Sequence, residues 1–122
     1  MTIRAHTAEV DSWAVHMAFH RVAGEPVSRR TITLRFKPNG EPLREAYLHF
    51  LPGARGKENI VSDTVVSMAL PAEEFQDWLH LLQTEAPLTF TWTVDEAKRE
   101  MLGVSLHTGD EPPGEGYVDL TP

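Results

Sequence analysis

The chain has 122 residues, enough for one domain with a single hydrophobic core, and 41% of them are hydrophobic. It contains no cysteine, which excludes disulfides, zinc–thiolate sites, iron–sulfur clusters and thiol catalysis. The formal net charge of −7 argues against general affinity for nucleic acid, because phosphate backbones repel an acidic surface.

The stretch WAVHMAFHR, residues 13–21, alternates large apolar residues with smaller or polar ones. As a strand it places four large side chains on one face, which we expect to form one wall of the core. As a helix, capped by Asp11 or Ser12, it leaves two of these four side chains off the apolar stripe, so the pattern favours a strand. The four residues are Trp13, Val15, Met17 and Phe19.

His16 and His20 in the same stretch have the spacing of a helical metal pair. On a strand their Cα atoms are about 13–14 Å apart, too far for both to bind one ion. The alternative helix would bring them together, but residue 17 is Met and not the Glu of an HExxH motif. We therefore predict no metal site and no cofactor.

Residues 28–37 and 43–51 predict two strands joined by the turn-forming sequence PNGEP at 38–42. Each strand has one apolar face, so the pair is expected to form an antiparallel hairpin that buries this face. The residues expected to be buried are Ile32, Leu34 and Phe36 in the first strand, and Ala46, Leu48 and Phe50 in the second.

The loop PGARGKEN at 52–59 contains glycine and lysine but lacks the GxxxxGK[ST] spacing of a phosphate-binding loop. It also precedes a strand, predicted over 60–70, instead of a helix. If this loop has a role, we expect contact with an anionic partner through Arg55 and Lys57.

One helix is predicted between Pro71 and Pro87, with Pro71 in its first turn. Its apolar residues recur with helical spacing. Pro87 ends it, because a residue before proline is disfavoured in the α region. The apolar stripe consists of Phe75, Trp78, Leu79 and Leu82.

The sequence LTFTWTV at 88–94 predicts a strand whose apolar residues face the core and whose threonines face outward. Residues 98–107 continue the alternation and predict a hairpin partner. The end of the chain, 109–122, is acidic and rich in glycine and proline, and is expected to be an extension outside the domain.

These elements predict an α+β, mainly β fold for residues 1–108. We expect a single curved antiparallel sheet of about six strands, in the order meander, helix, hairpin, with the helix packed on its apolar face. All three tryptophans, Trp13, Trp78 and Trp92, occupy apolar phases and are expected to pack in the core.

Candidate ligand-binding residues depend on how strongly this sheet curls. Tyr47 and His49 lie on the outer face of their predicted strand, and Asp63 and His107 converge with them only if the sheet curls. There is no GxSxG elbow and no paired-carboxylate motif, which favours a binding protein over an enzyme without deciding between them.

The charge is unevenly distributed along the chain. Residues 21–57 include eight basic and three acidic residues, a net charge of +5, so the rest of the chain carries −12. Solvated strand faces explain this most simply, but such asymmetry is also typical of a surface that meets an acidic partner or a second copy of the chain.

Three hypotheses follow. The leading one is a small binding domain that self-associates through a sheet face or edge, with a homodimer or another protein as partner. The second is a small-molecule-binding or enzymatic domain with a pocket between sheet and helix. The third is an acidic inhibitor, resembling immunity proteins in charge, that masks a basic partner. It is motivated by the acidic helix start, Glu73 and Glu74, and by the tail residues Asp110, Glu111 and Asp119. The N-terminal sequence lacks the apolar centre of a secretory signal, and no apolar run is long enough to cross a membrane. We therefore expect a cytoplasmic location and no membrane contact.

Overall fold

The computed structural model describes residues 2–38, 43–52 and 59–108, and within them the chain forms seven strands and one α-helix. A single 3-10 turn, Ala72–Glu74, precedes the α-helix. The predicted C-terminal extension, 109–122, lies outside the described residues. The elements in chain order are β1 Ile3–Val22, β2 Glu25–Phe36, β3 Glu45–Leu51, β4 Ile60–Val61, β5 Val65–Pro71, α1 Phe75–Thr84, β6 Leu88–Asp95 and β7 Glu100–Thr108.

The strands form one curled sheet in the order β4-β5-β3-β2-β1-β6-β7. Neighbouring strands are antiparallel except β3 and β5, which run parallel. The prediction of an antiparallel sheet of about six strands is therefore wrong in direction and in number. The reason is the short strand β4, which reverses the chain, so that β5 inserts between β4 and β3 in the direction of β3. Period-2 alternation carries no information about strand direction.

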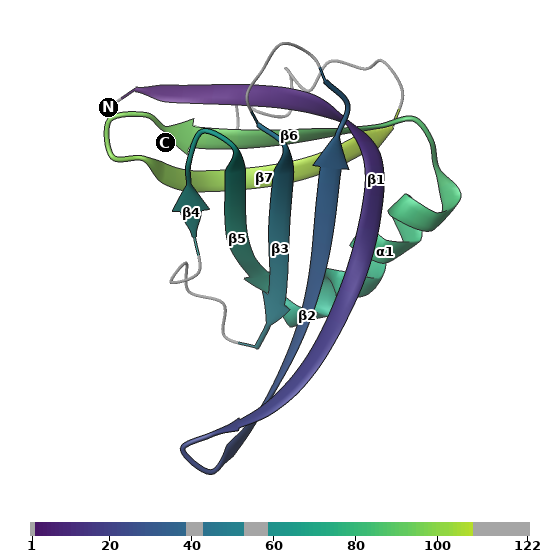
Figure 1. Cartoon of the computed structure of the whole chain (residues 1–122), viewed down its shortest axis with the longest axis vertical. Coiled ribbons are helices and arrows are strands. Elements are labelled where there is room, and N and C mark those ends of the chain that lie inside the picture. The colour runs from purple at the N-terminus through teal and green to yellow at the C-terminus, as the bar shows by residue number, and fades with distance from the viewer. Residues whose placement is uncertain (1, 39–42, 53–58, 109–122) are drawn as a thin grey trace.

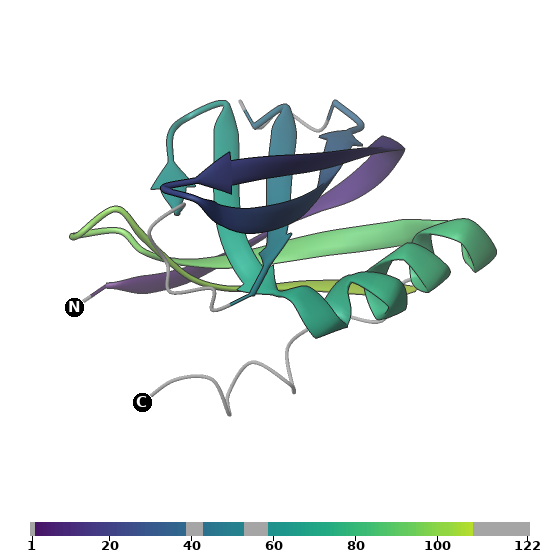
Figure 2. The ribbon, with the colours of Figure 1, turned by 90° about the horizontal axis from the view of Figure 1, so that it is seen from below.

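Strand β1 connects two layers of this sheet. Its first part, Ile3–Glu9, pairs with β6, and its second part, Val10–Val22, pairs with β2. The register shifts between Val10 and Ser12, and such irregularities allow a strand to bend. Figures 1 and 2 show β2, β3 and β5 in one layer, with β6 and β7 crossing them in a second.

The core fills the space between these layers. The ring of Phe36 lies 5.5 Å from that of Phe90 and 6.1 Å from that of Trp92, centroid to centroid. The predicted β2–β3 hairpin is confirmed, with Ile32 opposite Leu48. The alternation predicted for these two strands is confirmed as well, because the buried residues include Ile32, Leu34, Phe36, Ala46, Leu48 and Phe50.

The predicted helix is confirmed as α1, which covers one end of β3. The Phe75 ring meets the Phe50 ring edge-on at 5.4 Å, and Trp78 lies 6.2 Å from Phe50. On the neighbouring strand, the Arg30 guanidinium stands 5.1 Å above the Phe75 ring. Pro71 does not lie in the first helical turn as expected, since it ends β5 and precedes the 3-10 turn.

The single strand predicted over 60–70 is divided into β4 and β5 by a turn at Ser62. The Ser62 hydroxyl donates a hydrogen bond to the Val65 carbonyl oxygen, at 2.9 Å, and accepts one from the Val65 N–H, at 3.1 Å. A serine side chain that satisfies backbone groups in this way competes with ladder hydrogen bonds. The local side-chain bonds therefore stabilise a turn where the hydropathy pattern predicts continuous strand.

The stretch WAVHMAFHR is a strand, as predicted, but the expectation that it forms a wall of the core is wrong for three of its four large residues. Val15 packs against the core, whereas Trp13 is 37%, Met17 66% and Phe19 62% exposed. Strand β3 pairs with β2 only from Arg30 onward, so the outer part of the β1–β2 hairpin extends past its neighbours (Figure 1). No strand or helix of the described residues covers it there.

Candidate functional site

Over its second part, strand β1 has one edge that pairs with no other strand of the described residues. Its pairing with β6 ends at Glu9, which is opposite Thr89 near the start of β6. From Val10 to Val22 only the edge facing β2 is occupied. We call the opposite edge, from Val10 to Val22, the free edge.

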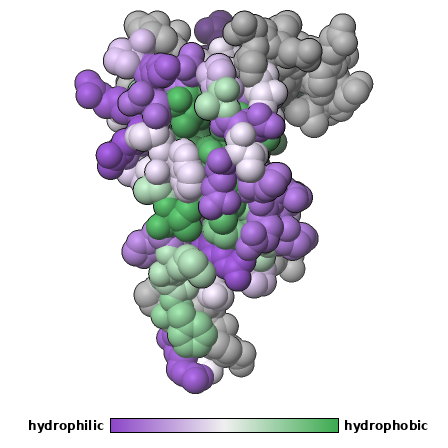
Figure 3. All heavy atoms as spheres, turned by 90° about the vertical axis from the view of Figure 1, so that its right-hand side faces the viewer, coloured by the Kyte–Doolittle hydropathy of each residue, from purple (hydrophilic) through white to green (hydrophobic). Residues whose placement is uncertain are grey.

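Among the hairpin side chains that the structure describes, the most exposed large apolar ones belong to β1 beside the free edge. Met17 and Phe19 lie on the same face of β1 and are both more than half exposed. Figure 3 shows this projection from the side, with hydrophobic atoms gathered on it away from the main body. A two-stranded ribbon is marginally stable by itself in water, so an apolar face on it is expected to gain from a partner.

The residues along the free edge offer little protection against strand pairing. Natural sheets usually block an open edge with proline, lysine or other charged residues. Between Ser12 and His20 the sequence has no proline and no acidic, lysine or arginine residue. Charges occur only at the two ends, as the exposed residues Asp11 and Arg21, and neither forms an ion pair within the part of the chain that the structure describes.

A groove of about 480 Å³ lies at the base of the free edge, where β1 leaves β6. Trp13 forms one side of it. The other side comes from the end of α1 and the following residues, which include a cis peptide bond between Ala86 and Pro87. The groove is lined by Glu9, Val10, Asp11, Trp13, Lys37, Leu82, Glu85, Ala86, Pro87 and Leu88.

The rim of this groove is mainly acidic. Glu9 and Lys37 form an ion pair, and the hydrogen bond from the Lys37 ammonium to the Glu9 carboxylate raises the pKa of Lys37 above its ordinary value. The charge of Glu9 adds to this effect, and Asp11 contributes least. Asp11 and Glu85 carry the remaining charges of the lining. The groove therefore combines an apolar floor with a rim suited to a cationic side chain.

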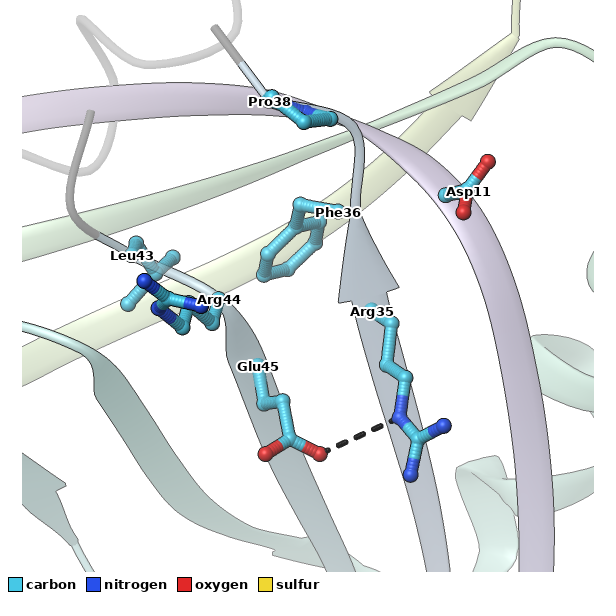
Figure 4. A pocket seen from close by; sticks show the side chains of 7 residues that line it. All are labelled: Asp11, Arg35, Phe36, Pro38, Leu43, Arg44 and Glu45. Carbon is cyan, nitrogen blue, oxygen red and sulfur yellow. Dashed lines mark hydrogen bonds and ion pairs between the residues drawn. The ribbon is translucent and has the colours of Figure 1, made fainter. Parts of the chain in front are cut away.

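A second cavity, of about 560 Å³, opens beside the ends of β2 and β3 (Figure 4). Phe36 lies at its back and Arg44 at its rim. Arg35 Nε donates to Glu45 Oε2 at 3.4 Å between the two strands, an interaction exposed to solvent. Charges of both signs alternate around the cavity, and they define no single ligand chemistry.

A third cavity is smaller, about 140 Å³, and contains a histidine that sequence analysis did not single out. His6 Nε2–H donates to Glu96 Oε1 at 3.1 Å, and the imidazole stacks on Trp92 at 5.3 Å between ring centroids. Asp63, a predicted ligand residue, lines the same cavity and lies 4.0 Å from the Arg99 guanidinium. No sequence motif joins His6 to Glu96, since they are 90 residues apart in the chain.

Of the other predicted ligand residues, the structure brings Tyr47 and His49 together. Both lie on the outer face of β3, with their rings stacked at 6.4 Å. His49 Nδ1 is hydrogen-bonded to the Thr31 hydroxyl, at 3.0 Å. Neither residue lines the three cavities described above.

His107, the fourth predicted ligand residue, lies on β7 opposite Thr89. Both of its ring nitrogens are buried without a hydrogen-bond partner, and so are the hydroxyls of Thr91 and Thr93. The prediction that these threonines are solvent-facing is wrong, because Thr91 and Thr93 are buried residues. A strand's alternation identifies two faces but does not show whether the second face stays open.

The remaining predicted site residues are not placed. Arg55, Lys57 and the acidic segment 109–122 lie outside the described residues.

His16 is exposed on β1, and no three His, Asp or Glu side chains within the described ranges are grouped closely enough to hold a metal ion. Over those same ranges, no helix has the length and apolarity needed to cross a membrane.

The comparisons with known proteins give no assignment. The sequence matches no protein-family model, and neither the curated proteins nor the solved structures contain a significant match to it. The free edge and the groove at its base are therefore interpreted from their own geometry and chemistry.

Proposed function

We propose that this protein is a binding domain that self-associates through the free edge of β1. The observation that carries the proposal is an unpaired strand edge, running from Val10 to Val22, that bears the exposed side chains of Met17 and Phe19. Half of the backbone N–H and C=O groups along such an edge point away from the sheet. A second strand laid beside it would pair them.

The apolar side chains add a driving force to this pairing. Fully burying a Met or Phe side chain is worth roughly 1.5–3 kcal/mol. The exposed face of the hairpin therefore gains most from a partner that presents apolar side chains at the same alternate spacing. A second copy of the chain presents such a strand at equal concentration.

The alternative hypothesis was a small-molecule or enzymatic pocket between the sheet and the helix. The space between β3 and α1 contains the packed rings of Phe50, Phe75 and Trp78, and the groove lined by Leu82 lies at the C-terminal end of the helix, beside the free edge. The acidic-inhibitor alternative depended on the acidic helix start, where Glu73 and Glu74 are exposed, and on the segment 109–122, which lies outside the described residues. The backbone of the free edge, in contrast, is described from Val10 to Val22.

The oligomeric state tests the proposal directly. The molar mass of the intact chain is measured by light scattering after size exclusion, over a wide range of concentrations. We expect a dimer that dissociates on dilution, and we expect the double variant Met17→Asp/Phe19→Asp to be monomeric with an unchanged circular dichroism spectrum.

The matched control is Leu102→Asp, which removes another exposed apolar side chain, this one on edge strand β7. It is expected to keep the dimer. A wild-type protein that stays monomeric at every concentration would refute self-association, and dissociation by Leu102→Asp alone would assign the interface to β7.

A further inference from the structure

We infer that two copies pair antiparallel along β1 with His16 at the symmetry axis, and that Phe19 of the second copy lies against Trp13 at the mouth of the groove. This inference rests on the proposed self-association and adds its register and its contacts. It follows from the backbone geometry of the hairpin, the length of the free edge and the order of its side chains.

The hairpin turn determines which backbone groups point outward. Ala23 and Gly24 both have positive φ, 52° and 85°, as in the two-residue turns that join hairpin strands, and Val22 is opposite Glu25. The pair that flanks such a turn exchanges both of its hydrogen bonds, and hydrogen-bonded pairs then recur at every second residue. From Ser12 to Val22 the even-numbered residues of β1 therefore bond to β2, and the odd-numbered residues 13–21 direct their N–H and C=O groups to the free edge.

The length of the free edge selects the register. In an isologous antiparallel pair the numbers of two opposite residues have a constant sum, and when that sum is even one position is its own partner at the axis. Val10 and Val22 bound the free edge, and the position midway between them is His16. Centring on His16 makes the whole edge overlap and pairs odd residues with odd residues, as the outward backbone groups require.

The side chains agree with this register. Around His16 it places Trp13 opposite Phe19 of the second copy, and Val15 opposite Met17. Residues directly opposite each other lie on the same face of a sheet, so these two pairs, each occurring twice, form one continuous apolar stripe. In each copy the exposed residues Met17 and Phe19 thus contact Val15 and Trp13 of the other copy, which are less exposed.

The groove receives the outer end of the second copy. Phe19 of that copy lies over Trp13, beside the apolar floor that includes Leu82 and Leu88. Two residues further along, Arg21 of the second copy reaches Asp11 at the acidic rim, where the register of β1 shifts. In this register the apolar Phe19 meets Trp13 and the basic Arg21 meets the acidic Asp11 at each end of the interface.

Neighbouring registers lose these matches. With the axis at residue 15, Phe19 comes opposite Asp11, and Arg21 comes opposite Glu9, where β1 is still paired with β6. With the axis at residue 17, Trp13 comes opposite Arg21 and Asp11 reaches only the turn. A shift by a single residue places outward backbone groups opposite inward ones. The axis at His16 is the register in which charge, apolar face and length agree.

Cysteine cross-linking tests the register, because the chain has no native cysteine. In the inferred pair the two residues at position 16 form a non-hydrogen-bonded pair with Cα atoms about 4.5 Å apart, within the range that a disulfide spans. His16→Cys is therefore expected to give a covalent dimer on mild oxidation. The matched variants Ala14→Cys and Ala18→Cys are expected to give none alone, because each thiol is about 13 Å along the strand from its copy.

A mixture of Ala14→Cys and Ala18→Cys provides the positive test of the same register. Position 14 lies opposite position 18 of the second copy, so the mixture is expected to give a covalent heterodimer. A non-covalent dimer of His16→Cys that forms no disulfide, while another position does, would overturn this register and leave self-association through β1 intact. A monomer by light scattering would overturn both.

Discussion

Strands β1 and β3 show the same alternation of large apolar residues with different outcomes. In β3, Ala46, Leu48 and Phe50 are almost completely buried, whereas in β1 Met17 and Phe19 are more than half exposed. The difference comes from the neighbours: β3 lies between β2 and β5 and beneath α1, but the outer part of β1 has β2 alone. Alternation thus identifies a face that is suited to burial, and the tertiary structure decides whether that burial occurs within one chain.

The largest expected effect contrasts a buried and an exposed phenylalanine. Phe50→Ala removes a ring packed against Phe75 and Trp78 and is expected to lower the free energy of unfolding by about 3–5 kcal/mol. Phe19→Ala is expected to change it by less than about 0.5 kcal/mol at concentrations where the protein is monomeric. Urea unfolding at low concentration measures both. Equal losses would show that Phe19 already has a partner within the chain.

The next effect concerns the groove at the base of the free edge. Trp13→Ala is expected to weaken self-association by at least about 30-fold, because a tryptophan packed in an interface commonly contributes 2 kcal/mol or more and this contact occurs twice. Its effect on the affinity is expected to exceed its effect on monomer stability, since Trp13 is partly exposed. Sedimentation equilibrium gives the affinity and urea unfolding the stability. Loss of stability without loss of affinity would assign Trp13 to the fold alone.

A charge exchange examines the two ends of the same interface. Asp11→Arg and Arg21→Asp are each expected to weaken their own dimer roughly tenfold, because each exposed ion pair contributes up to about 1 kcal/mol and occurs twice. An equimolar mixture of the two variants is expected to restore association, since the heterodimer regains opposite charges at both ends. Light scattering of the mixture measures this, and a mixture as weak as its components would contradict the pairing of Asp11 with Arg21.

The smallest expected effect lies in the turn that shapes the hairpin. Ala23 has a φ of 52°, a conformation that alanine adopts at a cost and asparagine adopts more readily. Ala23→Asn is expected to stabilise the hairpin by about 0.5–1 kcal/mol and to slow amide hydrogen exchange near the turn. Gly24→Ala, at a φ of 85°, is expected to act in the opposite direction. Exchange rates that do not respond to either variant would show that the turn does not limit opening of the hairpin.

Much of the fold was predictable because local sequence patterns determine several of its elements. The β2–β3 hairpin, the helix with its Phe75 face, and the strand nature of residues 13–21 follow from periodicity and turn chemistry. The mixed sheet was not predictable, because the parallel pairing of β3 and β5 depends on the short strand β4 and the turn at Ser62. The His6–Glu96 contact was equally unpredictable, because the two residues are 90 positions apart in the chain.

The sequence by itself determined which side chains share a face, where the helix lies and which chemistries a chain without cysteine excludes. Only the tertiary structure decided that the β1–β2 hairpin continues beyond β6 and β3, so that an apolar face suited to a core lies beside an unpaired strand edge. The physical reason is that periodicity is a property of one strand, whereas burial depends on which elements are placed against that strand. In WAVHMAFHR the alternation is complete, but no strand or helix of the described residues covers the outer part of its apolar face, where Met17 and Phe19 are exposed.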